Sequence, residues 1–280
     1  GIQALLRIAG KNPARLVATD LGFALGPRLN AAGRLDDISL GIQCLLCDDP
    51  QQALHTAQEL DELNQDRKSI ETGMQQQALA IVEQLGLDDK SMPAALCLFQ
   101  PDWHQGVVGL LASRIKEKYH RPVVAFARGD NGELKGSSRS IPGLHIRDAL
   151  DAVATQNPGL ITKFGGHAMA AGLSLTEDKL AEFEQAFQQQ VAELISEDDL
   201  QARLVTDGSL DAHQLSMHTA ELLRDAGPWG QQFPEPCFQG DFRIVQQRIV
   251  GEKHLKLVLA PQNQPEIAID AIWFNIDTAR

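Results

Sequence analysis

The most regular pattern of apolar positions runs from about Pro50 to Leu85 and has the three-to-four-residue period of an α-helix. The positions that form it are Ala53, Ala57, Leu60, Leu63, Ile70, Met74, Ala78, Ile81 and Leu85. A helix of roughly 35 residues extends for about 50 Å, which is long for a globular domain. We predict a connector between two domains. A coiled-coil arm is the alternative, and the polar residues Asp66, Arg67 and Lys68 disfavour it because they interrupt the apolar seam.

Residues 94–175 alternate between strand and helix patterns, which predicts an α/β domain. Strands are expected at 94–99 and 121–127 and from residue 172, and helices at 106–120, 145–156 and 178–195. The polar segment 133–140 is expected to be a strand or a loop. Before the connector, residues 1–18 predict one or two short helices with Pro13 at a helix start, and LGFALGPRLNAAGRL predicts a loop leading into a helix.

The pattern changes from about Leu200. One helix is expected at 215–227, followed by the Pro-rich turn PWGQQFPEP. FRIVQQRIV, HLKLVLAP and EIAIDAIWFN then alternate as half-buried strands. This order is typical of an OB-type β-barrel, and we expect the chain to stop before the barrel closes. Gly1 opens directly onto an apolar stretch, so both ends are expected to lie within the folded structure of a longer protein.

The charge is unevenly distributed. The chain carries a net charge of −12, yet residues 1–34 hold five Lys or Arg against one acidic residue, and residues 103–147 hold eight against three. Phosphate binding depends on the local positive potential more than on the net charge. These two basic segments therefore leave a nucleic-acid partner possible in spite of the negative net charge. Ordinary variation of surface charge is the alternative.

The cysteines and the apolar runs bear on location and partners. Cys44, Cys47, Cys97 and Cys237 are too scattered for a disulfide framework, which favours a cytoplasmic protein. Cys44 and Cys47 form a CxxC without a second pair, so a packed helix is favoured over a zinc or redox site. No run of about 18 apolar residues occurs, and we expect no membrane partner.

Four glycine-rich segments hold residues whose types suit a ligand. They are GPRLNAAGR with Arg28, Asn30 and Arg34; WHQGVVG with Trp103 and His104; KGSSRS with Lys135, Ser137 and Arg139; and FGGHAMAAG with Gly165, Gly166 and His167. Arginine forks and hydroxyls bind phosphate oxygens, and glycine lets the backbone approach a ligand. A histidine after paired glycines can donate to a phosphate or assist proton transfer. Tight helix packing and polar hairpins are the alternatives for each segment taken alone.

The sequence shows no metal-binding constellation. Its carboxylates are mostly single or on helical faces, and it contains no HExxH, Walker or GxSxG motif. Phosphodiester cleavage normally uses clustered Asp and His to hold divalent ions, and no such cluster is visible.

Taken in order, LGPRLNAAGR, GGHAMAAG and LLRDAGPWGQQFPEP resemble the RecJ family of the DHH phosphoesterase superfamily over the whole chain. The resemblance implies the end of a DHH catalytic domain at 1–48, a connector helix at 49–91, a DHH-associated domain at 92–197 and a truncated OB domain at 198–280. It implies a single-strand-specific 5′→3′ exodeoxyribonuclease of DNA repair and recombination. That enzyme would release 5′-mononucleotides with Mg²⁺ or Mn²⁺, whose ligands are expected upstream of Gly1.

The resemblance also implies roles for single residues. Asn30 and Arg34 match a motif near the scissile and terminal phosphates, Ser137 and Arg139 match a 5′-phosphate grip, and Trp103 and His104 match a contact loop. Gly166 and His167 match the GGH motif on the substrate side, and His167 is our candidate catalytic residue. Arg28, Lys135 and Gly165 lie in the same segments and are further substrate-binding candidates.

Two other functions stay open from the sequence. One is a non-catalytic nucleic-acid-binding module, and the other is a DHH-type phosphodiesterase of small oligonucleotides. The expected partner is single-stranded DNA with a 5′ end, and a single-strand-binding protein and a recombination helicase are further expectations. Because the metal ligands are expected elsewhere, we predict that this chain alone is inactive.

Overall fold

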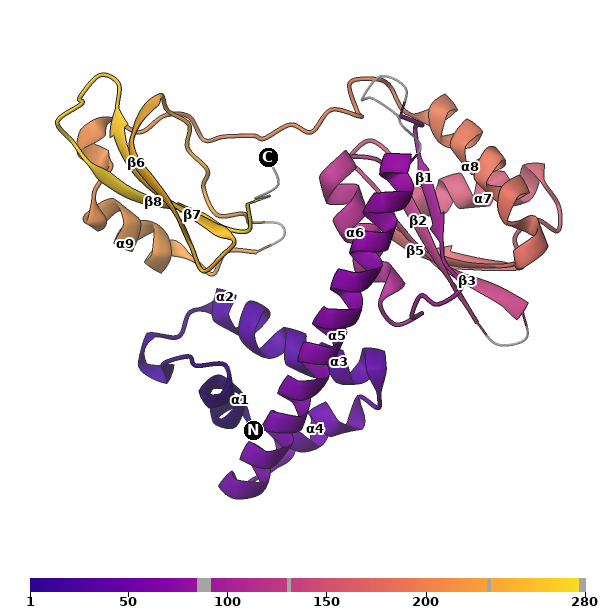
Figure 1. The fold of residues 1–280 in the computed structure, drawn as a ribbon, viewed down its shortest axis with the longest axis horizontal. Helices are drawn as coiled ribbons and strands as arrows, with labels where there is room; N and C mark the ends of the chain where they lie inside the picture. Colours follow the sequence, from indigo (N-terminus) through magenta and orange to yellow (C-terminus); the bar gives the residue numbers. More distant parts are fainter. Residues whose placement is uncertain (85–91, 130–131, 231–232, 277–280) are drawn as a thin grey trace. The chain divides into compact units, whose positions relative to one another are not determined.

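The computed structural model describes residues 1–84, 92–129, 132–230 and 233–276. The chain divides into two compact units, one of residues 1–16 and 20–202 and the other of residues 17–19 and 203–280 (Figure 1). The predicted end of the connector at Leu85 and the predicted boundary after residue 91 lie outside the described residues. Each unit has its own sheet, of five and of three strands.

The segment before the connector is helical throughout much of its length. Its elements are α1 (Ile2–Ile8), a 3₁₀ turn (Pro13–Arg15), α2 (Ala18–Asp20), a π-helical turn (Leu21–Leu25), α3 (Gly26–Leu35) and α4 (Ser39–Leu46). Pro13 begins a helical turn, as predicted. The helix predicted in LGFALGPRLNAAGRL is present as α3, but the loop expected before it is wrong, because a π turn continues directly into α3, with Pro27 in its first turn.

The connector helix α5 (Pro50–Gln84) confirms the long apolar pattern. Its buried apolar residues include Ala57, Leu60, Met74 and Ala78. Fully buried Ala31 and Ala32 of α3 leave room for the close packing of α3 on α5. The polar interruption of the seam is itself partly buried, because Arg67 is only 9% exposed.

The larger unit also contains a mixed sheet. Its elements are β1 (Leu96–Phe99), α6 (Val108–Tyr119), β2 (Val123–Arg128), β3 (Glu133–Arg139), α7 (Ile146–Gln156), β4 (Lys163–Gly166), β5 (Ala170–Thr176), a 3₁₀ turn (Glu177–Lys179) and α8 (Leu180–Leu194). The strand order is β1-β2-β3-β5-β4, with β1 and β2 parallel and the other pairs antiparallel. The predicted helices and strands are present, the polar segment is strand β3, and β4 is a strand that the sequence pattern did not indicate.

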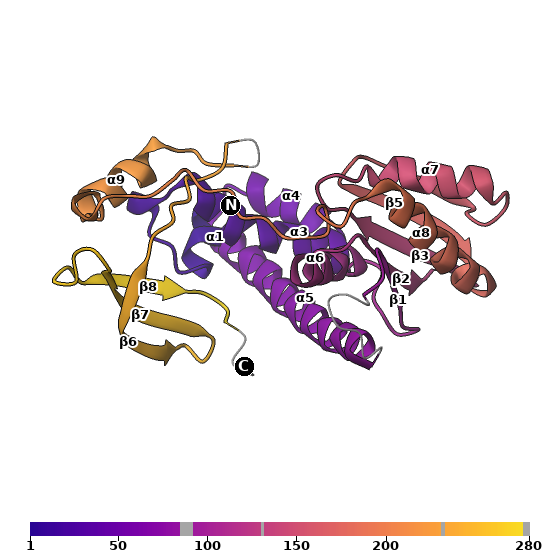
Figure 2. The same ribbon diagram turned by 90° about the horizontal axis from the view of Figure 1, so that it is seen from above.

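Alternating side chains of the strands serve two separate cores. In β2, Val124 and Phe126 pack with α7 and α8, which lie together on one face of the sheet (Figures 1 and 2). Val123 and Ala125 point to the other face, where α6 and α5 pack. The register of β2 with β3 places Ser137 and Arg139 on this second face. The α6 helix packs on that face against β2 and β3.

The smaller unit contains a 3₁₀ turn (Ala212–Gln214), α9 (Met217–Ala226) and the antiparallel strands β6 (Phe242–Val250), β7 (His254–Pro261) and β8 (Ile269–Trp273). All three strands were predicted. The prediction of half-buried strands is wrong for β6, which is exposed along nearly its whole length. Among the described residues, no helix has the length and apolar character that crossing a membrane requires.

Candidate functional site

The loop between β1 and α6 joins the sheet to the connector. Trp103 is 4% exposed, and its indole N–H donates to Oε1 of Gln77 on α5 at 2.6 Å. His104 turns the chain into α6, because its Nδ1 accepts the N–H of Gly106 at 3.1 Å. The structure therefore places Trp103 in the core under the loop, and not on an open surface.

Arg34 connects α3 to the start of α6. Its Nη1 donates to the carbonyl oxygen of Gly106 at 3.0 Å. A Cβ at Gly106 would overlap the Arg34 carbonyl oxygen, so only glycine permits this close approach of two backbones. Arg34 is thereby fixed beside the start of α6 by a bond to a residue 72 positions away in the sequence.

Arg139 and Ser137 reach the same turn of α6 from β3. The Nη1 of Arg139 donates to Ser137 Oγ at 3.2 Å and to the Ser138 carbonyl at 2.8 Å. A Cβ built on Gly109 would lie 2.8 Å from Nη2 of Arg139 and 2.9 Å from Ser137 Oγ. These two side chains therefore cover the first turn of α6, which is the positive end of the helix.

The charge of Arg34 acts on Arg139. Burial lowers the pKa of Arg139, and the charge of Arg34 lowers it further. Burial and the charge of Arg67 lower the pKa of Arg34, and Glu71 partly opposes them. Within the described residues, the bonds of Arg34 and Arg139 go to carbonyl and hydroxyl oxygens and to no carboxylate.

We call Arg34, Ser137, Arg139 and the first turn of α6 the arginine site. It contains one hydroxyl, the positive end of a helix and two arginines that form no ion pair with a carboxylate in the described part of the chain. An anion with several oxygens, such as a phosphate, matches this set of donors.

Two other basic residues of the predicted site form ion pairs with acidic side chains. Arg28 pairs with Asp61 on α5 at 2.7 Å and bonds the Ala24 carbonyl at 2.6 Å. Lys135 lies on the same strand face as Arg139, but it pairs with Glu133 and bonds Ser174 Oγ at 3.0 Å. Asn30 is exposed one helical turn before Arg34. The structure thus brings Arg34 and Arg139 together, whereas Arg28 and Lys135 form ion pairs with nearby carboxylates.

The GGH segment forms the turn between β4 and β5, beside the end of β3. The His167 N–H donates to the Ala170 carbonyl at 2.8 Å, and Ala170 is the register partner of Arg139. Gly166 has a φ of +147°, and a Cβ there would overlap backbone atoms of Ala171. Glycine is therefore required for this turn, which leaves the His167 side chain exposed next to the arginine site.

On the same face of the sheet, the positions next to Ser137 on the two neighbouring strands are glycines. Ser137 pairs with Gly172 of β5, and Gly172 pairs with Gly165 of β4. Both glycines are exposed, and a Cβ on Gly165 would meet nothing within 4 Å. We call Gly165 and Gly172 the glycine shelf. It offers an open backbone surface that runs from the arginine site across two strands.

The described residues do not form a metal centre. They contain no group of three or more His, Cys, Asp or Glu side chains that could hold an ion. The Cys44 side chain is buried in α4, and Cys47 follows at the end of that helix. Cys44 is therefore packed within a helix, as predicted.

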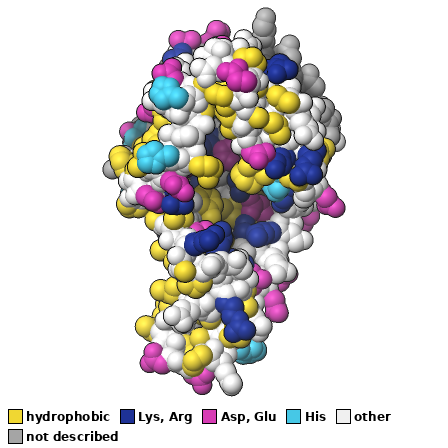
Figure 3. Space-filling model, turned by 90° about the vertical axis from the view of Figure 1, so that its left-hand side faces the viewer, with side chains coloured by type: hydrophobic (Ala, Val, Ile, Leu, Met, Phe, Trp, Pro, Cys, Tyr) yellow, Lys and Arg dark blue, Asp and Glu magenta, His cyan; other side chains and the backbone are white. Residues whose placement is uncertain are grey.

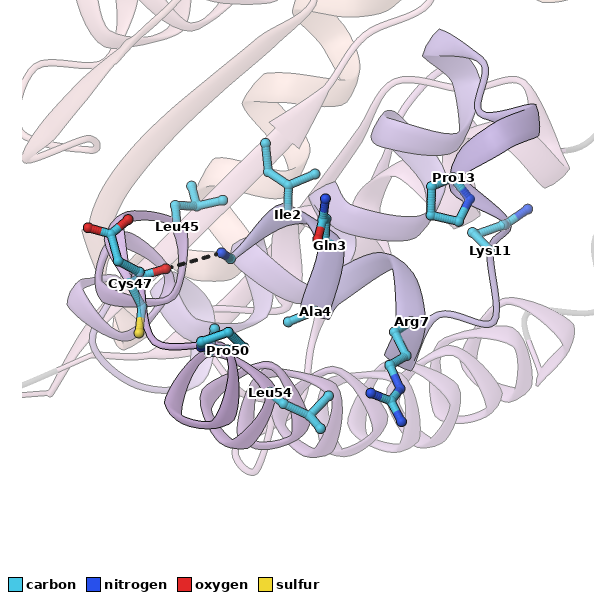
Figure 4. Close-up of a pocket in the computed structure, with 13 residues that line it drawn as sticks. Ile2, Gln3, Ala4, Arg7, Lys11, Pro13, Leu45, Cys47, Pro50 and Leu54 are labelled. Atoms are coloured by element: carbon cyan, nitrogen blue, oxygen red, sulfur yellow. Dashed lines mark hydrogen bonds between the residues drawn. The ribbon is translucent and has the colours of Figure 1, made fainter.

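A separate cavity of about 910 Å³ lies between α1, the end of α4 and the start of α5. Figure 4 shows Arg7 and Lys11 at one side of it and the bond from the Gly1 amino group to the Cys47 carbonyl at the other. None of the predicted site residues lines this cavity. The candidate site is therefore the open surface around Arg139.

The smaller unit carries exposed aromatic and basic side chains. Trp229 and Phe233 have ring centroids 4.8 Å apart, and Phe233 and Trp273 are 58% and 64% exposed. Arg248 pairs in register with Lys256 across β6 and β7. On the face shown in Figure 3, basic side chains lie among acidic and apolar ones. Phosphate binding therefore depends more on local groups of basic side chains than on the net charge of the chain.

The sequence reasoning missed one charged group behind the arginine site. Asn64, Arg67 and Glu71 of α5 are buried, and Glu71 also bonds Arg114 of α6. Their spacing of three and four residues was a signal, because it places them on one face of the helix.

Comparisons with known proteins agree on one family. Residues 90–193 match the DHHA1 domain, and residues 206–279 match the RecJ OB domain. The chain is 57% identical over 278 residues to the single-stranded-DNA-specific exonuclease RecJ of Salmonella typhimurium, and 56% identical over 279 residues to that of Escherichia coli. These alignments cover 99% and 100% of the chain, and the chain spans about half, 48%, of the length of both relatives.

A solved structure supports the fold. The crystal structure of RecJ in complex with Mg²⁺ from Thermus thermophilus matches with a TM-score of 0.78 and 27% identity, covering 99% of this chain and 41% of that one. The predicted α/β architecture with an OB part is thereby confirmed, while the exact boundaries at residues 48, 91 and 197 stay predictions. The chain belongs to the RecJ family and comprises its DHHA1 and OB domains.

Proposed function

We propose that this chain holds the 5′-phosphorylated end of single-stranded DNA in a longer RecJ-family protein that removes 5′-mononucleotides in the 5′→3′ direction. The relatives that it matches bear the name single-stranded-DNA-specific exonuclease. The observation that carries the proposal is the arginine site, in which Arg34 and Arg139 flank one helix end without a carboxylate partner.

A terminal phosphate fits this site better than an internal one. It carries more negative charge and has one more unbridged oxygen, so it can accept bonds from both arginines and from Ser137 at once. Charge-assisted bonds of this kind contribute about 1.5–3 kcal/mol each. The arginine site therefore explains why the protein would act from a 5′ end.

The remaining predicted residues would guide the first nucleotides. The glycine shelf lets a sugar-phosphate backbone approach the sheet, and His167 at its margin would donate to a phosphate or transfer a proton at the scissile bond. Asn30 is exposed on α3 and would contact the same phosphates. Downstream nucleotides would lie on exposed basic and aromatic groups of the OB domain.

Divalent ions would supply the attacking hydroxide when bound. Solved RecJ structures from Thermus thermophilus are complexes with Mg²⁺ and with Mn²⁺. The described residues of this chain do not form a fitting set of ligands. We therefore assign to this chain the binding and orientation of the strand, and we expect no Mn²⁺-dependent cleavage by the chain alone.

The test compares two ends of the same oligonucleotide in the full-length protein. Single-stranded DNA with a 5′-phosphate should be degraded with a lower KM than the same strand with a 5′-hydroxyl. Equal KM and kcat for the two ends would refute the assignment of Arg139 and Ser137 to a 5′-phosphate.

A non-catalytic binding module is the second candidate, and the lack of a metal-ligand group in the described residues favours it for this chain alone. Filter binding of the isolated chain to single-stranded DNA, together with an activity assay, separates the two. Turnover by the chain alone would contradict the division of labour proposed above.

A phosphodiesterase of small oligonucleotides is less well supported, because the match to a RecJ OB domain indicates a longer substrate. Activity restricted to dinucleotides in the full-length protein would favour it. A single-strand-binding protein and a recombination helicase remain proposed partners, and pull-down with the full-length protein tests them.

A further inference from the structure

A buried group of charges lies on α5 where the helix faces α6. Arg67 and Glu71 are 9% and 7% exposed, and Asn64 is 1% exposed. One oxygen of Glu71 accepts a bond from Arg67, and the other accepts Nε of Arg114 at 3.0 Å. Arg67 also donates to Asn64 Oδ1 at 2.8 Å. Buried charges are costly unless each is paired, so Glu71 is the group on which this arrangement depends.

This group is electrostatically connected to the arginine site. Arg67 lowers the pKa of Arg34, and Glu71 raises it. Glu71 thus neutralises a positive charge that would otherwise repel Arg34. Arg34 in turn lies close enough to Arg139 that its charge, after burial, lowers the pKa of Arg139.

The helix α5 also supports both sides of the arginine site mechanically. It holds α3, which carries Arg34, through the ion pair of Arg28 with Asp61 at 2.7 Å. It holds α6, whose first turn forms the floor of the site, through the ion pair of Arg114 with Glu71. The distance between Arg34 and the first turn of α6 therefore depends on contacts made by α5.

We infer that Glu71 is a positioning residue for the 5′-phosphate: it restrains Arg67 and Arg114 on α5 and α6, and so keeps Arg34 against Gly106 in the geometry that binds the terminal phosphate. This inference rests on the function proposed above. Without the Glu71 charge, Arg67 repels Arg34 across a buried space, and the arginine site loosens although Arg34, Ser137 and Arg139 are all present.

The test uses Glu71→Gln in the full-length protein, with oligonucleotides that carry a 5′-phosphate or a 5′-hydroxyl. The KM for the phosphorylated strand should rise about tenfold, which corresponds to about 1.4 kcal/mol. The KM for the hydroxyl strand and kcat for both strands should change less than about twofold, because these do not depend on the arginine site. A lower KM for both strands would mean that the added positive field dominates, and would overturn the inference.

Glu117→Gln is the matched control. Glu117 also pairs with Arg114, at 3.2 Å, but it is exposed on α6 and makes no bond to α5 in the described residues. This variant should keep the wild-type preference for the 5′-phosphate. If it loses the preference as strongly as Glu71→Gln does, the role assigned to Glu71 is wrong.

Two further variants protect the test against misfolding. Arg114→Gln changes a side chain that is 51% exposed, removes one of the two bonds of Glu71, and should raise the KM for the phosphorylated strand selectively but by less. The double variant Arg67→Gln with Glu71→Gln removes the repelling charge and should recover part of the lost preference. No selective change in Arg114→Gln and no recovery in the double variant would together overturn the inference.

The two proposals fail in different ways. If wild-type protein shows no preference for a 5′-phosphate, the proposed function fails. If the wild type shows the preference and Glu71→Gln retains it in full, the proposed function stands and only the positioning role fails.

Discussion

In strands β3 and β6, the polarity of the sequence does not match the position of the strand in the fold. The sequence of β3, ELKGSSR, is polar, yet the strand lies in the middle of the five-stranded sheet. The sequence of β6, FRIVQQRIV, is rich in apolar residues, yet nearly all of the strand is exposed. Leu134, Gly136 and Ser138 of β3 are buried on one face, while Ser137 and Arg139 reach the arginine site on the other.

The difference shows how a polar residue in a central strand can indicate a binding site. A central strand has neighbours on both sides, so its polar side chains need partners that the fold supplies or a ligand that binds there. Lys135 has partners, in Glu133 and Ser174, whereas the bonds of Arg139 to other described residues all go to neutral oxygens. This contrast within one strand is the reason for assigning the ligand to Arg139.

The largest expected effect comes from Arg139→Ala on β3. In the full-length protein it should weaken binding of the 5′-phosphate end by about 1.5–3 kcal/mol, the range for charged hydrogen bonds. The KM for a strand with a 5′-hydroxyl should hardly change, and kinetics on both ends measure this. Lys135→Ala is the control, because Lys135 lies on the same face of β3. An equal loss of 5′-phosphate binding in this variant would show that the roles of Arg139 and Lys135 do not differ.

Gly136→Ala tests the buried face of β3. An added Cβ would lie 2.6 Å from Phe126 and 2.8 Å from Leu173, both in the core. Overpacking of this kind costs about 1–3 kcal/mol. Hydrogen exchange of peptides from β2 and β3 should speed up, whereas Gly165→Ala, which meets open space, should leave exchange in these peptides unchanged.

Gly109→Ala separates site geometry from stability. The new methyl group would displace the ends of Arg139 and Ser137, which are flexible side chains. We expect loss of about 1 kcal/mol in 5′-phosphate binding, comparable to one hydrogen bond, with wild-type hydrogen exchange in β3. Unchanged discrimination between the two 5′ ends would show that the two side chains bind phosphate from another position.

Arg248→Ala on β6 should give the smallest effect, about 0.5–1 kcal/mol, because an exposed cation attracts phosphates only through screened charge. The loss should be equal for 5′-phosphate and 5′-hydroxyl strands and should diminish at high salt. Binding titrations at two salt concentrations measure it. A loss of binding confined to the oligonucleotide with a 5′-phosphate would contradict the contrast between β3 and β6.

Periodicity predicted much of the fold. The connector, the alternation of strands and helices in residues 94–195 and the three strands of the smaller unit follow from local patterns, which the sequence contains directly. The π turn before α3 and strand β4 did not follow, since glycine-rich sequence normally indicates loops. Gly166 instead belongs to a strand because its register with Ala171 allows a close backbone approach.

The sequence predicted the candidate site as a set of residues of suitable types, and the structure shows which of these residues lie together. Arg28 and Arg34 look alike in GPRLNAAGR, but among the described residues only Arg28 forms an ion pair with a carboxylate on α5. Trp103 looked like a contact residue and is buried under its loop. Pairing and burial depend on residues far away in the chain, so local sequence could not separate these roles.

The sequence by itself determined the family, the order of the elements and the supply of arginine, serine and glycine near phosphate-binding turns. Tertiary structure alone decided that Arg34 and Arg139, more than 100 residues apart, share one helix end. It also decided that Glu71 stands behind them as a counter-charge. The physical reason is that hydrophobic patterns act through neighbours along the chain, whereas the balance of buried charges depends on which distant segments the fold brings into contact.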